Sequence, residues 1–194
     1  MSVNLLEKVQ QNLGYPPLHK IDPNTQQFTM LKDGIAEDKF SQAAIPAVLT
    51  AMYKYMQSDK GAESFLRGIN SPDWVAQIFA GHIADVIRKV AEYADVPLSK
   101  GIVPKLNQIA NEAERVAKEN LPANAGVQDV KTFFHGQRNN ILLYLPPALN
   151  IGDMLNDDTL DDNTNKMEGP VSNLMKTIGS VFSTPVSGEK EHHH

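Results

Sequence analysis

Residues 71–95, SPDWVAQIFAGHIADVIRKVAEYAD, carry the most regular apolar pattern in this chain of 194 residues. Apolar side chains recur there every three or four positions, the spacing that places them on one face of an α-helix. The row consists of Val75, Phe79, Ile83, Ile87, Val90 and Ala94, and it is widened by Trp74, Ile78 and Val86. Ser71 and Pro72 suit the N-cap and the first helical position. We therefore predict one long central helix over 71–95, in which Ile83 and Ile87 are buried.

Helical periodicity continues through most of the remaining chain. The predicted helices cover residues 3–13, 34–56, 62–69, 97–120, 127–145 and 148–155. Pro46 falls inside the second of these, where we expect a kink or a break, and Pro104 lies inside the fourth. Leu98 is expected on the buried face of the fourth helix, and Gly136 marks a point where the fifth could be interrupted. Because β-branched residues never alternate with polar ones over a strand-length run, we predict an all-α fold with one compact multi-helix domain at 1–155.

A shift of 58 positions superposes two parts of the chain, residues 35–56 and 93–114. The shift places Ile45-Pro46 on Val103-Pro104 and Phe40-Ser41 on Leu98-Ser99. The identities are few, so duplication and chance explain the similarity equally well. Duplication would give two helix–turn–helix-like units packed around the central helix.

Each unit contains Ile or Val followed by Pro, one further residue and an apolar residue: Ile45-Pro46-Ala47-Val48 and Val103-Pro104-Lys105-Leu106. Together with the preceding helix end and short turn, this pattern resembles the YidB-like family of bacterial all-helical domains over residues 28–120. The resemblance implies homeodomain-like helix packing, a bacterial source and no established activity. It assigns no site residues to this chain.

The charge and cysteine content narrow the classes of function. The chain has 18 Lys and Arg against 23 Asp and Glu, a net charge of −5, and no run of basic residues. Because nucleic-acid binding depends on clustered Lys and Arg, a nucleic-acid partner is disfavoured. The chain has no Cys, and therefore no disulfides, thiolate nucleophiles or Cys-ligated metals. Together with the lack of a signal-peptide pattern and of an apolar run of about 18 residues, this predicts a cytoplasmic protein without a membrane span.

Common catalytic and cofactor-binding motifs are absent from the sequence. It contains no Gly-x-Ser-x-Gly elbow, no Gly-x-x-x-x-Gly-Lys phosphate loop and no Gly-x-Gly-x-x-Gly motif. His19, His82 and His135 do not have the i, i+4 spacing of metal ligands on a helix, and His82 is expected to be a packed residue within the central helix. We predict no catalytic, cofactor or metal site, and hence a non-enzyme. A hydrolase that uses paired carboxylates is a less favoured alternative.

Residues 156–169, NDDTLDDNTNKMEG, form an acidic stretch that we predict to be a flexible loop. From Asp157 onward, oxygen-bearing side chains occupy alternate positions, and Glu168 stands twelfth, as in a helix-flanked calcium loop. Asp162, however, occupies the sixth position, where such loops need Gly for a sharp turn. We therefore predict a solvated loop without a specific calcium site.

Residues 170–182 are predicted to form a C-terminal amphipathic helix. Its apolar residues, which we predict to be an interaction surface, are Val171, Leu174, Met175, Ile178 and Val181. A helix of about 12 residues is marginal alone in water, so it needs a surface to fold against. That surface is either its own domain or another chain. Residues 183–194 are predicted to be a disordered tail that ends in the purification-tag residues His192 to His194.

These observations favour a non-enzymatic structural or protein–protein interaction module with an unknown protein partner or with self-association. The alternative is a helix–turn–helix-type protein that binds DNA or a ligand. DNA binding would require a contiguous basic stripe, for which the candidates are Lys54, Lys60, Arg67, Arg88, Lys100 and Lys105. The polar run at 135–140 could contact a ligand, although helix capping explains it equally well. An enzyme would show ionisable groups that converge in a pocket.

Overall fold

The computed structural model describes residues 2–21, 38–68 and 73–157. The chain divides into a compact unit of residues 1–163 and a second unit of residues 164–194, and all described residues belong to the first unit. The predicted helix at 170–182, with its proposed interaction residues, lies outside the described residues, as does the acidic stretch beyond Asp157.

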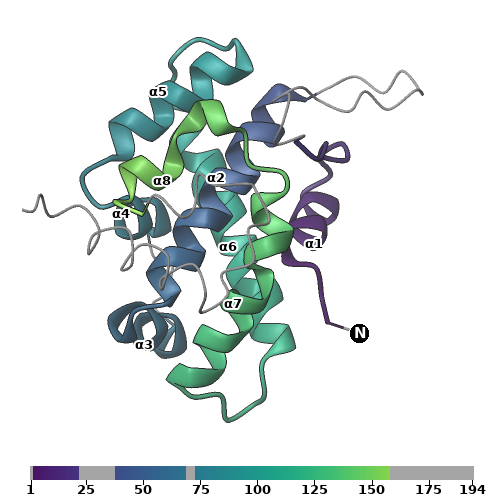
Figure 1. The fold of residues 1–194 in the computed structure, drawn as a ribbon, viewed down its shortest axis with the longest axis vertical. Helices are drawn as coiled ribbons and strands as arrows, with labels where there is room; N and C mark the ends of the chain where they lie inside the picture. The colour runs from purple at the N-terminus through teal and green to yellow at the C-terminus, as the bar shows by residue number, and fades with distance from the viewer. Residues whose placement is uncertain (1, 22–37, 69–72, 158–194) are drawn as a thin grey trace, which may run out of the picture. The chain divides into compact units, whose positions relative to one another are not determined.

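Helices make up the regular secondary structure of the described residues, no strand occurs among them, and the predicted all-α class is thereby confirmed (Figure 1). The α-helices are α1 (Leu5–Asn12), α2 (Lys39–Met56), α3 (Asp59–Arg67), α4 (Trp74–Phe79), α5 (Ile83–Ala94), α6 (Ile102–Asn120), α7 (Val127–Leu142) and α8 (Ile151–Met154), and a 3-10 turn, η1 (Pro147–Leu149), precedes α8. Asn4, Asp38, Ser58 and Asp73 cap the first four helices, because each side chain accepts a hydrogen bond from a backbone N–H of the first turn.

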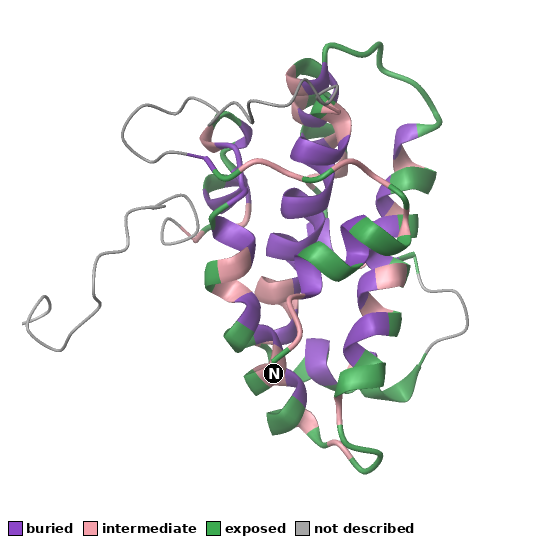
Figure 2. Cartoon of the chain, turned by 90° about the vertical axis from the view of Figure 1, so that its right-hand side faces the viewer, coloured by how far each residue is buried: buried purple, intermediate pink, exposed green. Residues whose placement is uncertain are grey.

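Helix α2 occupies the centre of the unit and contacts seven other helices: α1, α3, α4, α5, α6, α7 and α8. It is buried along most of its length, including the polar residues Ser41, Gln42 and Thr50. Figure 2 shows the buried residues on the sides of the helices that face inward. Pro46 lies inside α2 without ending it, so a break into two helices near Ala44–Pro46 is wrong.

The predicted single helix over 71–95 is wrong, because the structure divides it into α4 and α5. α4 begins at Trp74 with Asp73 as its N-cap, and the predicted cap Ser71 and first helical residue Pro72 lie outside the described residues. It ends before Gly81, whose φ of 87° is a left-handed conformation that glycine adopts without strain. Both helices contact α2. The apolar stripe is therefore wide because it belongs to two helices, each with its own buried side.

Several residues that we predicted to be buried lie nearer the surface. Ile83 and Ile87 are half-buried, whereas Val86 and Val90 of the same helix are fully buried. The register of α5 points these two valines at the core and leaves the isoleucines at the edge of the interface. Leu98 is 65% exposed and precedes the next helix, so its predicted place on a buried helical face is also wrong.

The later helices differ from prediction at their boundaries. α6 begins at Ile102, which places Pro104 in its first turn, where a backbone N–H has no intrahelical acceptor to lose. α7 continues through Gly136 without interruption. The two prolines of the suspected repeat thus occupy different places, since Pro46 lies deep inside α2. The repeat, its two helix–turn–helix-like units and the homeodomain-like packing stay predictions.

Two buried glutamines fix the N-terminal segment to the helices. Gln42 of α2 accepts a hydrogen bond from the His19 N–H at 2.8 Å and donates to the carbonyls of His19 and Tyr144 at 3.0 and 2.9 Å. Gln137 of α7 accepts from the Leu5 N–H at the start of α1, at 2.9 Å. Because these amides satisfy backbone groups that would otherwise be buried without partners, they hold the segment in place.

Candidate functional site

An apolar ridge projects from the link between α5 and α6. It consists of Val96, Pro97 and Leu98, and we call it the α5–α6 ridge. Val96 is 39% exposed and Leu98 is 65% exposed, the largest value among the large apolar side chains of the described residues. Local backbone chemistry produces the ridge. Asp95 ends α5 in a left-handed conformation, the Val96 N–H donates to the Ala91 carbonyl at 3.0 Å, and proline cannot extend the helix.

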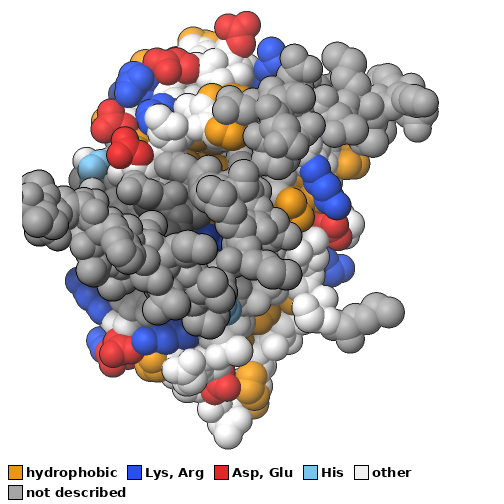
Figure 3. Space-filling model, viewed as in Figure 1, with side chains coloured by type: hydrophobic (Ala, Val, Ile, Leu, Met, Phe, Trp, Pro, Cys, Tyr) orange, Lys and Arg blue, Asp and Glu red, His pale blue; other side chains and the backbone are white. Residues whose placement is uncertain are grey.

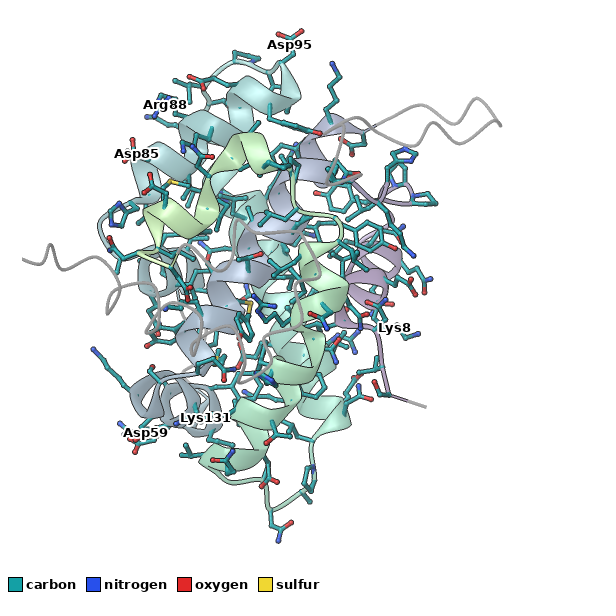
Figure 4. The ribbon with its side chains drawn as sticks, viewed as in Figure 1. Lys8, Asp59, Asp85, Arg88, Asp95 and Lys131 are labelled. Carbon is teal, nitrogen blue, oxygen red and sulfur yellow. The ribbon has the colours of Figure 1, made fainter. Side chains whose placement is uncertain are left out.

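A hollow of about 510 Å³ lies beside the ridge and is lined by Arg88, Ala91, Glu92 and Asp95 together with the ridge residues. Arg88 donates to Glu92 at 3.2 Å and to Asp85 at 3.5 Å. These carboxylates raise the pKa of Arg88, mainly through the hydrogen bond from Arg88 to Glu92. Figure 4 shows Asp85, Arg88 and Asp95 along the outer side of α5. Charges of both signs therefore surround an apolar centre.

A second surface is a groove of about 650 Å³ between α2, α3 and α4, which we call the basic groove. Its lining residues are Lys54, Tyr55, Ser58, Lys60, Ser64, Ala76, Gln77, Ile78 and Ala80. Lys54 and Lys60 are the charged members of this set, and they come from the last turn of α2 and the first turn of α3. The groove therefore presents positive charge beside hydroxyl groups and a short apolar floor.

One carboxylate already lies against the basic groove. The Asp157 carboxylate is 2.7 Å from the Lys54 Nζ, and the Asp157 N–H donates to the Gly152 carbonyl at 2.8 Å. Asp157 is the last residue that the structure describes, so the described chain ends next to Lys54.

The structure does not join the six candidate residues of a basic stripe into one surface. Lys54 and Lys60 lie together in the basic groove. The other cations with described contacts are spread over different helices. Arg67 pairs with Glu63 of α3 at 2.8 Å, Arg88 belongs to α5, and Lys105 of α6 lies 5.1 Å from the centre of the Phe40 ring. On the face shown in Figure 3, Lys and Arg side chains are mixed with Asp and Glu.

The histidines occupy three separate environments. The backbone of His19 is held by Gln42. His82 is half-buried at the break between α4 and α5, not within a helix as predicted. His135 is exposed on α7, with its ring 6.5 Å from that of Tyr53. Across residues 2–21, 38–68 and 73–157, no three His, Asp or Glu side chains are placed to share a metal ion.

Sequence reasoning missed both surfaces. The apolar spacing of the following helix predicts Leu98 in the core, but that helix begins only at Ile102. Within the polar run at 135–140, Gln137 is buried and accepts a hydrogen bond from the Leu5 N–H of α1. Its role in the structure is therefore to join two helices. Gly101, which is the N-cap of α6, is the local signal for the later start, because glycine is among the residues favoured at an N-cap.

Comparison with protein-family models, with curated proteins and with solved structures finds no match to this chain. The resemblance to YidB-like domains thus stays a sequence-based expectation. Among the helices that the structure describes, none has the length and apolar character required to cross a membrane.

Proposed function

We propose that this chain is a non-enzymatic protein-interaction module that self-associates through the α5–α6 ridge. The observation that supports the proposal is the 65% exposure of Leu98 beside Val96 and a hollow. Covering a leucine fully is worth about 1.5–3 kcal/mol. An exposed leucine gains this stabilisation only when another surface covers it, and exposed apolar patches mark interaction sites.

The charges around the ridge favour a second copy of the chain as its partner. Arg88, Glu92 and Asp95 all line the hollow, so the patch carries charges of both signs around its apolar centre. In a two-fold contact the same patch meets itself, so each charge can face its opposite. Arg88 of one copy would then pair with an acidic residue of the second copy around a shared apolar centre of Leu98 side chains.

Charge pairing within the chain supports a protein partner over nucleic acid. Lys54, Arg67 and Arg88 each lie within 4.0 Å of a carboxylate oxygen. A phosphate backbone would have to displace these carboxylates and would gain little net neutralisation. The alternative of a helix–turn–helix-type DNA-binding protein therefore ranks second.

Sedimentation equilibrium of the full chain tests the proposal. The unchanged chain should form dimers, and Leu98→Asp should shift the equilibrium to monomers because it places a charge in the contact. Leu66→Asp is the matched control, since Leu66 is 37% exposed but belongs to α3. Both variants should retain the helical circular-dichroism signal. An unchanged chain that stays monomeric at the highest concentrations, or a Leu98→Asp variant that dimerises normally, would reject the proposal.

A further inference from the structure

The basic groove has one lysine whose charge is not offset by the acidic residue next to it. Lys60 follows Asp59 in the first turn of α3, but the Asp59 carboxylate is 2.6 Å from the Lys131 Nζ of α7 (Figure 4). Lys54 holds the Asp157 carboxylate at the other side of the groove. Within the described residues, Lys60 has no carboxylate partner. Of the two groove lysines, Lys54 is therefore paired with Asp157, the last described residue, whereas Lys60 is not paired with a described carboxylate.

The sequence after Asp157 matches the remaining charge. Residues 157–168 contain five acidic side chains and one lysine, which accounts for most of the net charge of −5. Asp161 and Asp162 follow Asp157 by four and five residues, and an extended chain advances about 3.3 Å per residue. They can therefore reach across a groove that Asp157 already borders. Linkage within one chain raises their effective concentration at Lys60 to about the millimolar range.

We propose that the basic groove is the docking site of the chain's own acidic segment, residues 158–162, with Asp157 on Lys54 as its first contact and an aspartate on Lys60 as its second. The occupied groove excludes other anions until they compete with these aspartates. The pairing is a surface one, so it weakens as salt screens the charges.

Energy transfer from Trp74 can measure the docking directly. The chain has one Trp and no Cys, so Asn163→Cys gives a single site for an acceptor dye. Trp74 is fixed close to the groove, because its Nε1 donates to Glu114 at 2.7 Å and its ring lies 6.5 Å from that of the groove residue Tyr55. An excess of unlabelled chain separates transfer within one molecule from transfer between copies.

The transfer efficiency should be high at low salt. It should fall in the Lys54→Gln/Lys60→Gln variant, in an Asp161→Asn/Asp162→Asn variant, and at 1 M NaCl, where the screening length is about 3 Å. Combining the lysine and aspartate changes should lower it no further than either alone. Lys8→Gln/Lys39→Gln is the matched control, because Lys8 belongs to α1 and Lys39 begins α2 at the end opposite to Lys54. The control should leave the efficiency unchanged.

Two results would overturn the proposal. The first is an efficiency that does not respond to the groove lysines while circular dichroism shows all variants folded. The second comes from competition at low salt. Deca-aspartate should displace the segment and lower the efficiency, as expected of a carboxylate site. If a short DNA duplex lowers it and deca-aspartate does not, the groove selects phosphates and the acidic segment is not its occupant.

Discussion

Helix α2 is buried around most of its circumference, whereas α5 buries one stripe and exposes the rest. The buried residues of α5 are Val86, Val90, Ala91 and Ala94, and its opposite side carries an ion-paired row of Asp85, Arg88 and Glu92. The buried residues of α2 include a stripe of small side chains, namely Ala43, Ala44, Ala47 and Ala51. Short side chains at a helix crossing allow the two helix axes to approach closely. The difference between α2 and α5 therefore indicates that a helix with small buried residues can be surrounded by neighbours.

The largest predicted effect is on the free energy of unfolding. It is tested with two separate variants, an isoleucine-to-alanine substitution in α2 and another in α5. Ile45→Ala in α2 removes a fully buried side chain and should lower the free energy of unfolding by about 2–5 kcal/mol, through lost burial and a residual cavity. Ile87→Ala in α5 removes a half-buried side chain and should cost about 1 kcal/mol. Urea unfolding followed by circular dichroism measures both values. Equal losses would show that α5 is as central as α2.

The all-α class could be predicted because helical spacing of apolar residues is a local property. Which helix is central could not, because it depends on contacts between segments far apart in the chain. The row in 71–95 has large apolar side chains, which produce a strong helical pattern. Residues 39–56 include buried Ser41, Gln42 and Thr50, which a sequence pattern assigns to a solvated side. The division at Gly81 was also missed, because a helix tolerates an isolated glycine.

The second prediction concerns the side-chain hydroxyl of Thr50, which lies in the buried part of α2. The Thr50 hydroxyl is fully buried and has no hydrogen-bond partner within the described residues. Thr50→Val keeps the shape and removes the hydroxyl, so it should raise the free energy of unfolding by about 1–2 kcal/mol. Thr132→Val on the exposed side of α7 is the control and should change stability by less than about 0.5 kcal/mol. A destabilised Thr50→Val variant would mean that the hydroxyl is hydrogen-bonded.

Neither proposed surface could be assembled from sequence alone. The α5–α6 ridge depends on where α6 begins, and helix boundaries are the least certain part of any sequence pattern. The basic groove joins Lys54 and Lys60 with Gln77 and Ile78 across three helices, so it requires their packing. The acidic stretch at 156–169 was visible in the sequence, but the lysine that its first aspartate binds was not.

The third prediction tests the division between α4 and α5 by comparing two glycines. An added methyl group meets no atom within 4 Å at either Gly81 or Gly136, so only the backbone conformation differs. Gly81 has a φ of 87°, and Gly81→Ala should cost about 1–2 kcal/mol. Gly136 lies inside α7, and Gly136→Ala should add about 1 kcal/mol because alanine favours the helix. Thermal unfolding of both variants should show shifts of opposite sign. A stabilised Gly81→Ala variant would indicate a continuous helix over 71–95.

The smallest predicted effect compares α5 with a matching ion-paired row on α6. Each row has an arginine that binds carboxylates one turn before and one turn after it, Arg88 in α5 and Arg115 in α6. They differ in burial and in tertiary contact. The Glu92 side chain is 63% exposed, whereas that of Glu112 is 15% exposed and also accepts a hydrogen bond from Asn12 of α1 at 2.7 Å. The α6 row thus links two helices, and the α5 row belongs to one.

Replacing each glutamate measures what its row contributes, and the pH dependence at Glu112 identifies the cause. The hydrogen bond from Arg115 is the main cause that lowers the pKa of Glu112 below its ordinary value of 4.5, with a further contribution from Asn12. A lowered pKa in the folded state contributes stability above the ordinary pKa, and this contribution is lost as the pH falls through the folded-state pKa. Glu112→Gln should therefore reduce the free energy of unfolding at pH 7 by less than about 1 kcal/mol. The difference from the unchanged chain should disappear in acid. Urea unfolding at several pH values between neutral and acid measures this difference, and a difference that persists in acid would contradict the assignment. Glu92→Gln is the comparison at pH 7 and should cost less than Glu112→Gln, because the Glu92 side chain is the more exposed of the two.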